Sequence, residues 1–231
     1  VIVFDKLAIS KTFDTADNFT DRRTIIYARN ACFDIAEKLK LKYFLELDDD
    51  YIFFGYKKIL KNNKLSCVSA KQLDRLFEGM IQFLEKSNAL TVAMAQGGDF
   101  FGGTDGGVLK LGIKRKAMNT FFCKTDRKFQ WVGRVNEDVN TYVNLGSRGK
   151  LLMTYTKAYI NQVQTQANAG GMTEMYLDSG TYVKSFYTVM YNPSCVKLVA
   201  LGKTGRRRIH HKIKWNNCTP KIINEKYRKV G

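Results

Sequence analysis

The stretch KYFLELDDDYIFF, residues 42–54, joins an apolar strand pattern to three adjacent aspartates. Residues 43–47 are typical of a largely buried β-strand, and Asp48, Asp49 and Asp50 follow directly. In extended backbone, residues two apart point to the same side, so Asp48 and Asp50 share a face and Asp49 points away. Two such carboxylates favour a divalent cation, Mn²⁺ or Mg²⁺, which fills its remaining positions with water and phosphate oxygens. A solvated acidic turn is the alternative interpretation.

The segments before this strand predict a β-α-β arrangement. Residues 1–5 are strand-like and end at Asp5, and apolar residues recur at helical spacing over residues 28–40. A strand, a helix and a second strand in this order favour a parallel sheet. Open sheets of this kind bind ligands at the carboxyl ends of their strands, which is where the aspartates fall.

The rest of the chain continues the alternation of helices and strands. A capping-box pattern at residues 69–72 predicts the start of a helix that reaches residue 84, and further helices are expected at 136–146 and 180–193. Strands are expected at 90–95, 118–123, 129–135, 151–155, 196–201 and 208–215, with a glycine-rich loop at 97–107. We therefore expect an α/β fold with a mixed, mostly parallel sheet flanked by helices. No repeat or linker divides the chain, which predicts a single domain over residues 1–231.

The charge balance is strongly basic and indicates a polyanionic partner. The 231 residues include 38 Lys and Arg against 21 Asp and Glu, which gives a net charge of +17. Nucleic acid is the usual partner of such a chain, although a merely basic soluble protein is the alternative. The basic residues form separate clusters, and the candidates for DNA contact are Lys114, Arg115, Lys116, Arg206, Arg207, Arg208, Lys212 and Lys214.

Other patterns restrict the class of protein. Five scattered cysteines without a C-x-x-C pair argue against a zinc site or a disulfide framework and favour a reducing cytoplasm. No run of 18 apolar residues and no signal peptide are found, so no membrane partner is expected. GGDFFGG at 97–103 is not a dinucleotide fingerprint, and GKT at 202–204 lacks the upstream glycine of a P-loop.

Three motifs in order resemble the GT-A fold glycosyltransferases, whose sheet is Rossmann-like. YARNACFDIAEKLKLKYFLELDDDY (27–51) is similar to the family's nucleotide-sugar-binding core, in which an A-R-N helix start precedes the strand that delivers a D-x-D motif. GRVNEDVNTY (133–142) is similar to its later E-D motif, and RIHHKIKW (208–215) offers histidines near the end of the chain.

The resemblance implies a role for each matching residue. Arg29 and Asn30 would contact the sugar donor, and Asp5 the nucleoside. Asp48 and Asp50 would bind the metal and, through it, the donor diphosphate. Glu137 or Asp138 would be the catalytic base, and His210 or His211 a metal or phosphate ligand. Alternation along an extended 208–215 predicts that one histidine is packed and the other presented.

A narrower resemblance concerns the acceptor. GTYVKSFYTVMYNPSCVKL (180–198) and RRRIHHKIKWNNCTPKII (206–223) look like the phage TET-associated DNA glycosyltransferases, relatives of the base J glucosyltransferase. This implies a phage protein in the host cytoplasm that moves glucose from UDP-glucose to a 5-hydroxymethylpyrimidine, 5-hydroxymethylcytosine above all, in double-stranded DNA. The alternatives are a GT-A enzyme with a polysaccharide or protein acceptor, and a non-catalytic DNA-binding module.

Two details complete the expectations. GT-A domains begin with a strand and helix that this sequence lacks, so the natural protein is expected to start upstream of Val1. If the target base is flipped out of the duplex, it needs aromatic stacking partners. Phe100 and Phe101 in the glycine-rich loop would supply them; the favoured alternative is that they anchor the loop to the core.

Overall fold

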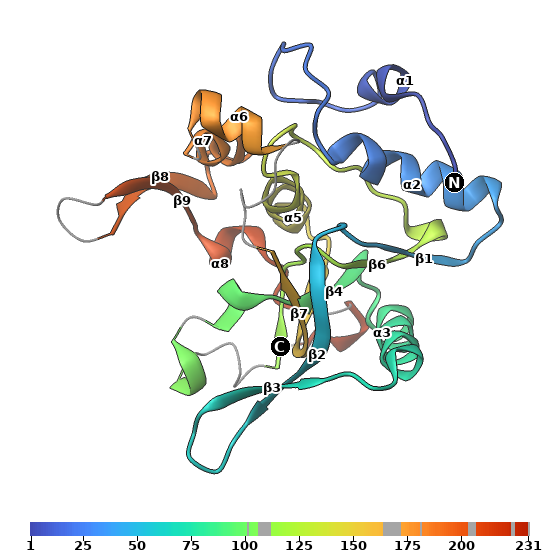
Figure 1. The fold of residues 1–231 in the computed structure, drawn as a ribbon, viewed down its shortest axis with the longest axis vertical. Coiled ribbons are helices and arrows are strands. Elements are labelled where there is room, and N and C mark those ends of the chain that lie inside the picture. Colours follow the sequence, from blue (N-terminus) through green and yellow to red (C-terminus); the bar gives the residue numbers. More distant parts are fainter. Residues whose placement is uncertain are drawn as a thin grey trace. The chain divides into compact units, whose positions relative to one another are not determined.

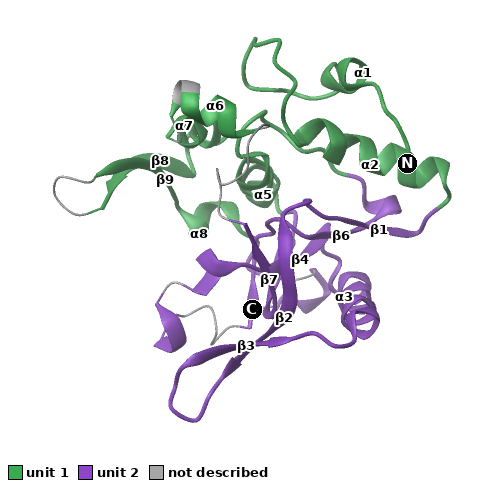
Figure 2. Ribbon diagram, in the orientation of Figure 1, with its two compact units in different colours: residues 1–40, 129–149, 164–219 green, residues 41–128, 150–163, 220–231 purple. Residues whose placement is uncertain are grey.

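The chain forms two compact units, each built from three separate stretches of sequence (Figure 2). Unit 1 comprises residues 1–40, 129–149 and 164–219, and unit 2 comprises 41–128, 150–163 and 220–231. The computed structural model describes residues 1–100, 102–105, 112–163, 172–180, 182–202, 207–222 and 225–230. The single domain expected over residues 1–231 stays a prediction.

Unit 2 contains a mixed β-sheet in the order β1-β6-β4-β7-β2-β3, with β5 paired to β7 (Figure 1). Its strands are β1 (Tyr43–Glu46), β2 (Tyr51–Ile59), β3 (Leu65–Ser69), β4 (Thr91–Ala95), β5 (Ile113–Lys114), β6 (Phe121–Lys124) and β7 (Leu152–Gln162). Of the pairs in the described part of the sheet, β4 and β7 are parallel and the others antiparallel.

The expectation of a mostly parallel sheet is therefore wrong, although the α/β class is confirmed. The expected parallel neighbour of β1 does not exist, because residues 1–5 form no strand, and β1 pairs with β6 in antiparallel fashion instead. Furthermore, β2 returns along β3 after a short turn, which only an antiparallel pair permits.

Helix α3 (Leu73–Ser87) covers part of this sheet and closes its core. The predicted helix is confirmed, and its Leu76, Met80 and Leu84 are buried against strands β4, β6 and β7. The predicted capping box is wrong: Ser69 ends β3, and the helix begins after Gln72 without a side-chain cap. Short 3₁₀ turns occur at η1 (Gly97–Phe100), η2 (Gly103–Asp105), η3 (Thr125–Arg127) and η4 (Glu225–Tyr227).

Unit 1 is mainly helical and carries a separate β-hairpin. Its elements are α1 (Lys6–Ser10), α2 (Ile26–Lys38), α5 (Glu137–Ser147), α6 (Met172–Ser179), α7 (Val183–Tyr191), α8 (Trp215–Cys218) and the antiparallel strands β8 (Val196–Leu201) and β9 (Arg208–Ile213). The helices predicted at 28–40, 136–146 and 180–193 and the strands predicted at 196–201 and 208–215 are confirmed, with shifts of a few residues at their ends.

Two strands predicted in unit 1 are wrong. Asp5 is the N-cap of α1, and its carboxylate accepts the Leu7 N–H at 2.8 Å. Residues 129–135 form no strand, although most of them are buried and only Gln130 is exposed. Gly133 and Arg134 donate their N–H groups to the carbonyls of Asp14 and Thr15 in an irregular segment. The apolar pattern at 129–135 therefore reports burial and not a strand. No helix in the described part of the chain is long and apolar enough to cross a membrane.

Candidate active site

The acidic turn, residues 48–50, connects β1 to β2 in unit 2. Asp48 and Asp50 are half-buried while Asp49 is exposed, which agrees with the side-chain alternation expected from the sequence. The turn is held by Val163, directly after β7, which donates its N–H to the Asp50 carbonyl at 3.0 Å. The aspartates do not lie at the edge of a parallel sheet, because β1 is antiparallel to its neighbour.

The Asp50 carboxyl lies in a site that disfavours its negative charge. Its Oδ1 atom is buried and has no hydrogen-bond partner in the described part of the chain. Burial, then the charges of Asp48 and Asp49, raise the pKa of Asp50. A bound cation would relieve both effects.

Asp48 and Asp50 fit a divalent metal ion whose remaining ligands are water and the phosphates of the substrate. Within the described ranges, no group of three or more His, Cys, Asp or Glu is arranged to hold a metal ion. Mg²⁺ characteristically takes one or two carboxylates and leaves its other positions to water and phosphate. Asp48 and Asp50 match that donor set, and a closed protein cage is not required.

In unit 1, Arg29 and Glu137 form a nearly buried ion pair between α2 and α5. The guanidinium Nη1 lies 2.6 Å from Glu137 Oε1, and the side chains are 5% and 13% exposed. The Arg29 guanidinium also lies 5.5 Å from the centre of the Trp131 ring. Arg29, a predicted donor contact, and Glu137, a predicted catalytic base, are thus partners in one ion pair. A carboxylate paired with a guanidinium is a poor proton acceptor.

Asn30 is also engaged within unit 1. Its side-chain amide donates to the Trp131 carbonyl at 3.1 Å and accepts the Trp131 N–H at 2.9 Å. This double contact fixes the irregular segment that leads into the E-D motif. The predicted contact between Asn30 and the donor stays a prediction.

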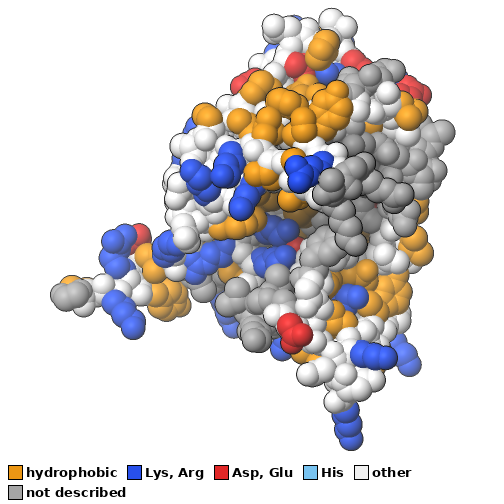
Figure 3. Space-filling model, turned by 90° about the vertical axis from the view of Figure 1, so that its left-hand side faces the viewer, with side chains coloured by type: hydrophobic (Ala, Val, Ile, Leu, Met, Phe, Trp, Pro, Cys, Tyr) orange, Lys and Arg blue, Asp and Glu red, His pale blue; other side chains and the backbone are white. Residues whose placement is uncertain are grey.

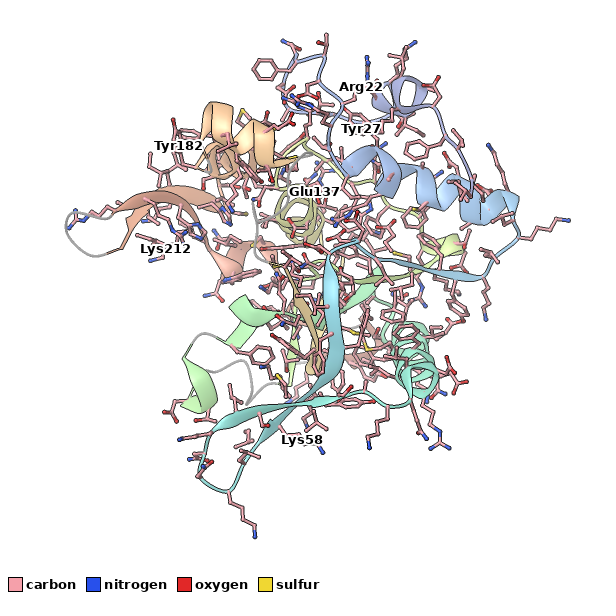
Figure 4. The ribbon with its side chains drawn as sticks, viewed as in Figure 1. Arg22, Tyr27, Lys58, Glu137, Tyr182 and Lys212 are labelled. Atoms are coloured by element: carbon pink, nitrogen blue, oxygen red, sulfur yellow. The ribbon has the colours of Figure 1, made fainter. Side chains whose placement is uncertain are left out.

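Asp138 differs from Glu137 in its surroundings. It is half-buried in the first turn of α5, and its Oδ1 accepts the Val139 N–H at 2.7 Å. Its negative charge acts on Tyr176 of α6 and on Lys184 of α7. The two carboxylates of the E-D pair therefore lie in different surroundings: Arg29 holds Glu137, whereas Asp138 acts on Lys184. Figure 4 shows Glu137, the neighbouring residue, at α5.

The start of α5 is fixed by a buried polar network. Asn136, with φ of 62°, donates its side-chain amide to Thr188 Oγ1 at 2.6 Å, and Thr188 donates to Asn140 Oδ1 at 2.8 Å. The Asn140 amide lies so close to Gly133, whose φ is 82°, that a Cβ there would come within 2.2 Å of Nδ2. Only glycine suits position 133. Through Thr188, helix α7 fixes the start of α5 and with it the backbone of the E-D pair.

Lys184, Arg208, His210 and His211 form what we call the basic cluster of unit 1, on α7 and β9. The two imidazole rings stack with centres 4.3 Å apart, and both are half-buried. Neither ring is fully buried or fully exposed, so the predicted split into one packed and one presented histidine stays a prediction. His211 Nδ1 is buried without a hydrogen-bond partner among the described residues.

Burial, and after it neighbouring positive charge, lowers the pKa of both histidines of the basic cluster and keeps them neutral. Burial, then the charges of His210 and Lys184, lower the pKa of His211 to about 4. Burial, then Arg208 and Lys184, lower the pKa of His210. Burial also lowers the pKa of Lys184, against the opposing charge of Asp138. Surroundings this positive suit a phosphate better than a metal ion.

The predicted DNA contacts fall into two groups. Lys114 and Lys116 of unit 2 pair with Asp99, which is 1% exposed, at 2.7 and 2.8 Å, and Arg115 donates to the Lys221 carbonyl at 2.7 Å. These three residues therefore have partners within unit 2. By contrast, the side chains in and beside β9 are exposed: Arg207, Arg208, Lys212 and Lys214. Figure 4 labels Lys212 on this hairpin. Arg206 lies outside the described residues.

Phe100 is packed within unit 2. Its ring meets that of Tyr159 edge-on at 5.6 Å, and Lys57 Nζ lies 4.9 Å from its centre. This arrangement agrees with the anchoring role favoured from the sequence. Phe101 lies outside the described residues. Asp5, in contrast, is exposed at the start of α1, and its contact with a nucleoside stays a prediction.

Comparison with known families assigns the protein to an enzyme class. The chain belongs to the TET-Associated Glycosyltransferase family, whose model matches residues 1–171. It is therefore a glycosyltransferase, as the sequence motifs predicted. The matched stretch contains the acidic turn and the E-D motif, whereas the basic cluster follows it. No curated protein and no solved structure matches the chain significantly.

Proposed function

We propose that the enzyme moves a sugar from a nucleoside diphosphate donor, UDP-glucose, to the hydroxyl of 5-hydroxymethylcytosine in phage DNA within the host cytoplasm. The observation that supports a nucleoside diphosphate donor is the Asp48–Asp50 pair: a buried Asp50 oxygen, without a hydrogen-bond partner among the described residues, is influenced by the charge of Asp48. The net charge of +17 supports DNA as the acceptor.

Transfer breaks the bond between the anomeric carbon and the diphosphate oxygen and forms one to the acceptor oxygen. The nucleoside diphosphate leaves with the bonding electrons, and the acceptor hydroxyl loses its proton. Mn²⁺ or Mg²⁺ held by Asp48 and Asp50 would supply Lewis-acid stabilisation of the leaving group.

The residues of unit 1 take two roles in this proposal. Asp138 accepts the hydroxyl proton, since Glu137 is held by Arg29. The basic cluster binds phosphate oxygens, with Lys184 and Arg208 supplying charge and the neutral imidazoles supplying N–H donors. Arg29 and Asn30 fix the chain around the E-D motif within unit 1.

Mass spectrometry of digested nucleosides tests the proposal. The enzyme is incubated with Mn²⁺, UDP-glucose and duplex DNA containing hydroxymethylcytosine, hydroxymethyluracil or neither. We expect a hexose on hydroxymethylcytosine and none on unmodified DNA. Labelling of hydroxymethyluracil alone would correct the base, and labelling of none, with transfer to a polysaccharide or protein, would overturn the DNA acceptor.

A further inference from the structure

Strands β2 and β3 of unit 2 extend beyond the sheet as a two-stranded ribbon (Figure 1). The last contact of β2 with β7 pairs Tyr56 with Ala158, whereas its pairing with β3 continues for three more residue pairs, from Lys57 with Cys67 to Ile59 with Leu65. We call residues 57–67 the basic ribbon. Beyond the sheet it reaches roughly 10 Å at the usual rise per residue, and its turn adds to this.

The turn of the basic ribbon is a defined structure. Leu60 donates its N–H to the Lys64 carbonyl at 2.9 Å, and Asn63 donates its N–H to the Leu60 carbonyl at 2.9 Å. Asn63 takes a φ of 59°, which asparagine tolerates, and the Asn62 side chain accepts the Lys64 N–H at 3.2 Å. The lysines of the turn are therefore presented on an ordered support.

The charge of the ribbon has one sign. No Asp or Glu occurs between Asp50 and Asp74, while this interval holds five lysines. Lys58, Lys61 and Lys64 are exposed, and no described residue forms an ion pair with them. Figure 3 shows Lys and Arg side chains at the lower end of the molecule, where the ribbon ends, and Figure 4 labels Lys58.

We propose that the basic ribbon binds the sugar-phosphate backbone of duplex DNA, with its tip directed into the major groove. A two-stranded ribbon fits that groove, and the lysines of β2 and of the turn match phosphates along the groove edges. Exposed Ile59 and Leu60, between the lysines, supply apolar contact to the groove wall. The choice of DNA as the polyanion rests on the proposed function, but the ribbon acts without sugar transfer.

Titration of duplex affinity against salt tests the ribbon directly. The full chain is measured with unmodified duplex DNA and no donor, and is compared with K58Q/K61Q/K64Q. The matched control K11Q/K40Q/K229Q removes three exposed lysines elsewhere. We expect the ribbon variant to bind at least about tenfold more weakly, and the slope of log K against log salt concentration to be shallower by about 2 to 3. The control variant should bind like wild type.

Cys67 gives a second readout without a change of charge. Of the five cysteines it alone is exposed, and it lies across from Lys57. We expect duplex DNA to slow alkylation of Cys67 by N-ethylmaleimide severalfold, with little effect on half-buried Cys32. Equal rates with and without DNA, together with equal affinities for the two triple variants, would overturn the proposal.

The outcomes separate this inference from the proposed function. Ribbon-dependent DNA binding without transfer to any DNA would retain the ribbon and reject the acceptor. DNA binding that ignores the ribbon lysines would reject the ribbon and leave the acceptor standing. Binding to phosphatidylserine vesicles in place of DNA, with the same loss in the ribbon variant, would assign the surface to a membrane and overturn the proposal.

Discussion

The acidic turn and the basic cluster are polar sites of opposite charge. In the acidic turn, neighbouring carboxylates and burial raise the pKa of Asp50, so the turn gains from a cation. In the basic cluster, Lys184, Arg208 and burial keep two imidazoles neutral, so the cluster gains from an anion. The comparison favours phosphate over a metal as the ligand of the histidines, although adjacent histidines usually suggest a metal.

The largest expected effect is that of Asp50→Asn. Loss of a metal ligand removes several kcal/mol of leaving-group stabilisation, so transfer should fall by about a thousandfold. Asp49→Asn is the matched control, because Asp49 is adjacent but exposed, and should keep nearly full activity. Donor turnover with and without EDTA measures both. Full activity of Asp50→Asn would remove the acidic turn from the mechanism.

Next in size is the contrast within the E-D pair. Asp138→Asn should lower the rate constant for transfer by about a hundredfold, as expected for a lost base, while leaving the fold intact. Single-turnover assays and urea unfolding distinguish these effects. A small rate loss, with Glu137→Gln the inactive variant, would reverse the assignment.

Glu137→Gln should act mainly on stability. It leaves the 5% exposed Arg29 guanidinium without its charge partner, which typically costs about 3 kcal/mol in the free energy of unfolding. The double variant Arg29→Met/Glu137→Gln should recover part of that loss, because both charges of this ion pair are then absent. Unchanged urea unfolding of Glu137→Gln would show that the pair does not hold α2 to α5.

A smaller effect is expected in the basic cluster. Lys184→Gln should weaken the binding of UDP about tenfold, because one charged donor to phosphate is lost. Lys197→Gln, an exposed lysine on β8, is the control and should bind UDP like wild type. Isothermal titration measures the affinities. Equal UDP affinity in the two variants would show that the basic cluster does not bind the phosphates of UDP.

The smallest effect concerns pH. His211 in the folded chain stays neutral down to a pKa of about 4, whereas in the unfolded chain it takes up a proton near 6.5. Protonation therefore favours unfolding as the pH falls from about 6.5 towards 4. Thermal denaturation across this range should show a steeper loss for wild type than for His211→Gln. Identical pH profiles would mean that His211 is not desolvated.

Sequence reasoning succeeded where local periodicity sets the structure. The helices around Arg29, Asp138 and Lys184 and the strand bearing the histidines were predicted, because apolar spacing reports burial along one element. The different burial of Asp49 and its neighbours followed from the same alternation.

Pairing between distant segments could not be predicted in this way. Apart from the local pair β2–β3, strand direction in the sheet depends on partners 30 residues apart (Val92 with Phe122) to 111 residues apart (Tyr51 with Gln162). The basic run KKILKNNK at 57–64 does not by itself show that β2 and β3 form a ribbon. The ion pair of Arg29 with Glu137 joins residues 108 positions apart. Lys184 was missed because one lysine on an amphipathic helix carries no signal until β9 is packed beside it.

Location of the metal tests the central claim most directly. Crystals grown with MnCl₂ and UDP would be measured at the manganese absorption edge. The account predicts an anomalous peak within coordination distance of Asp48 and Asp50 carboxylate oxygens, with the diphosphate bound to the same ion. A diphosphate bound elsewhere, with both side chains in contact with water alone, would contradict it.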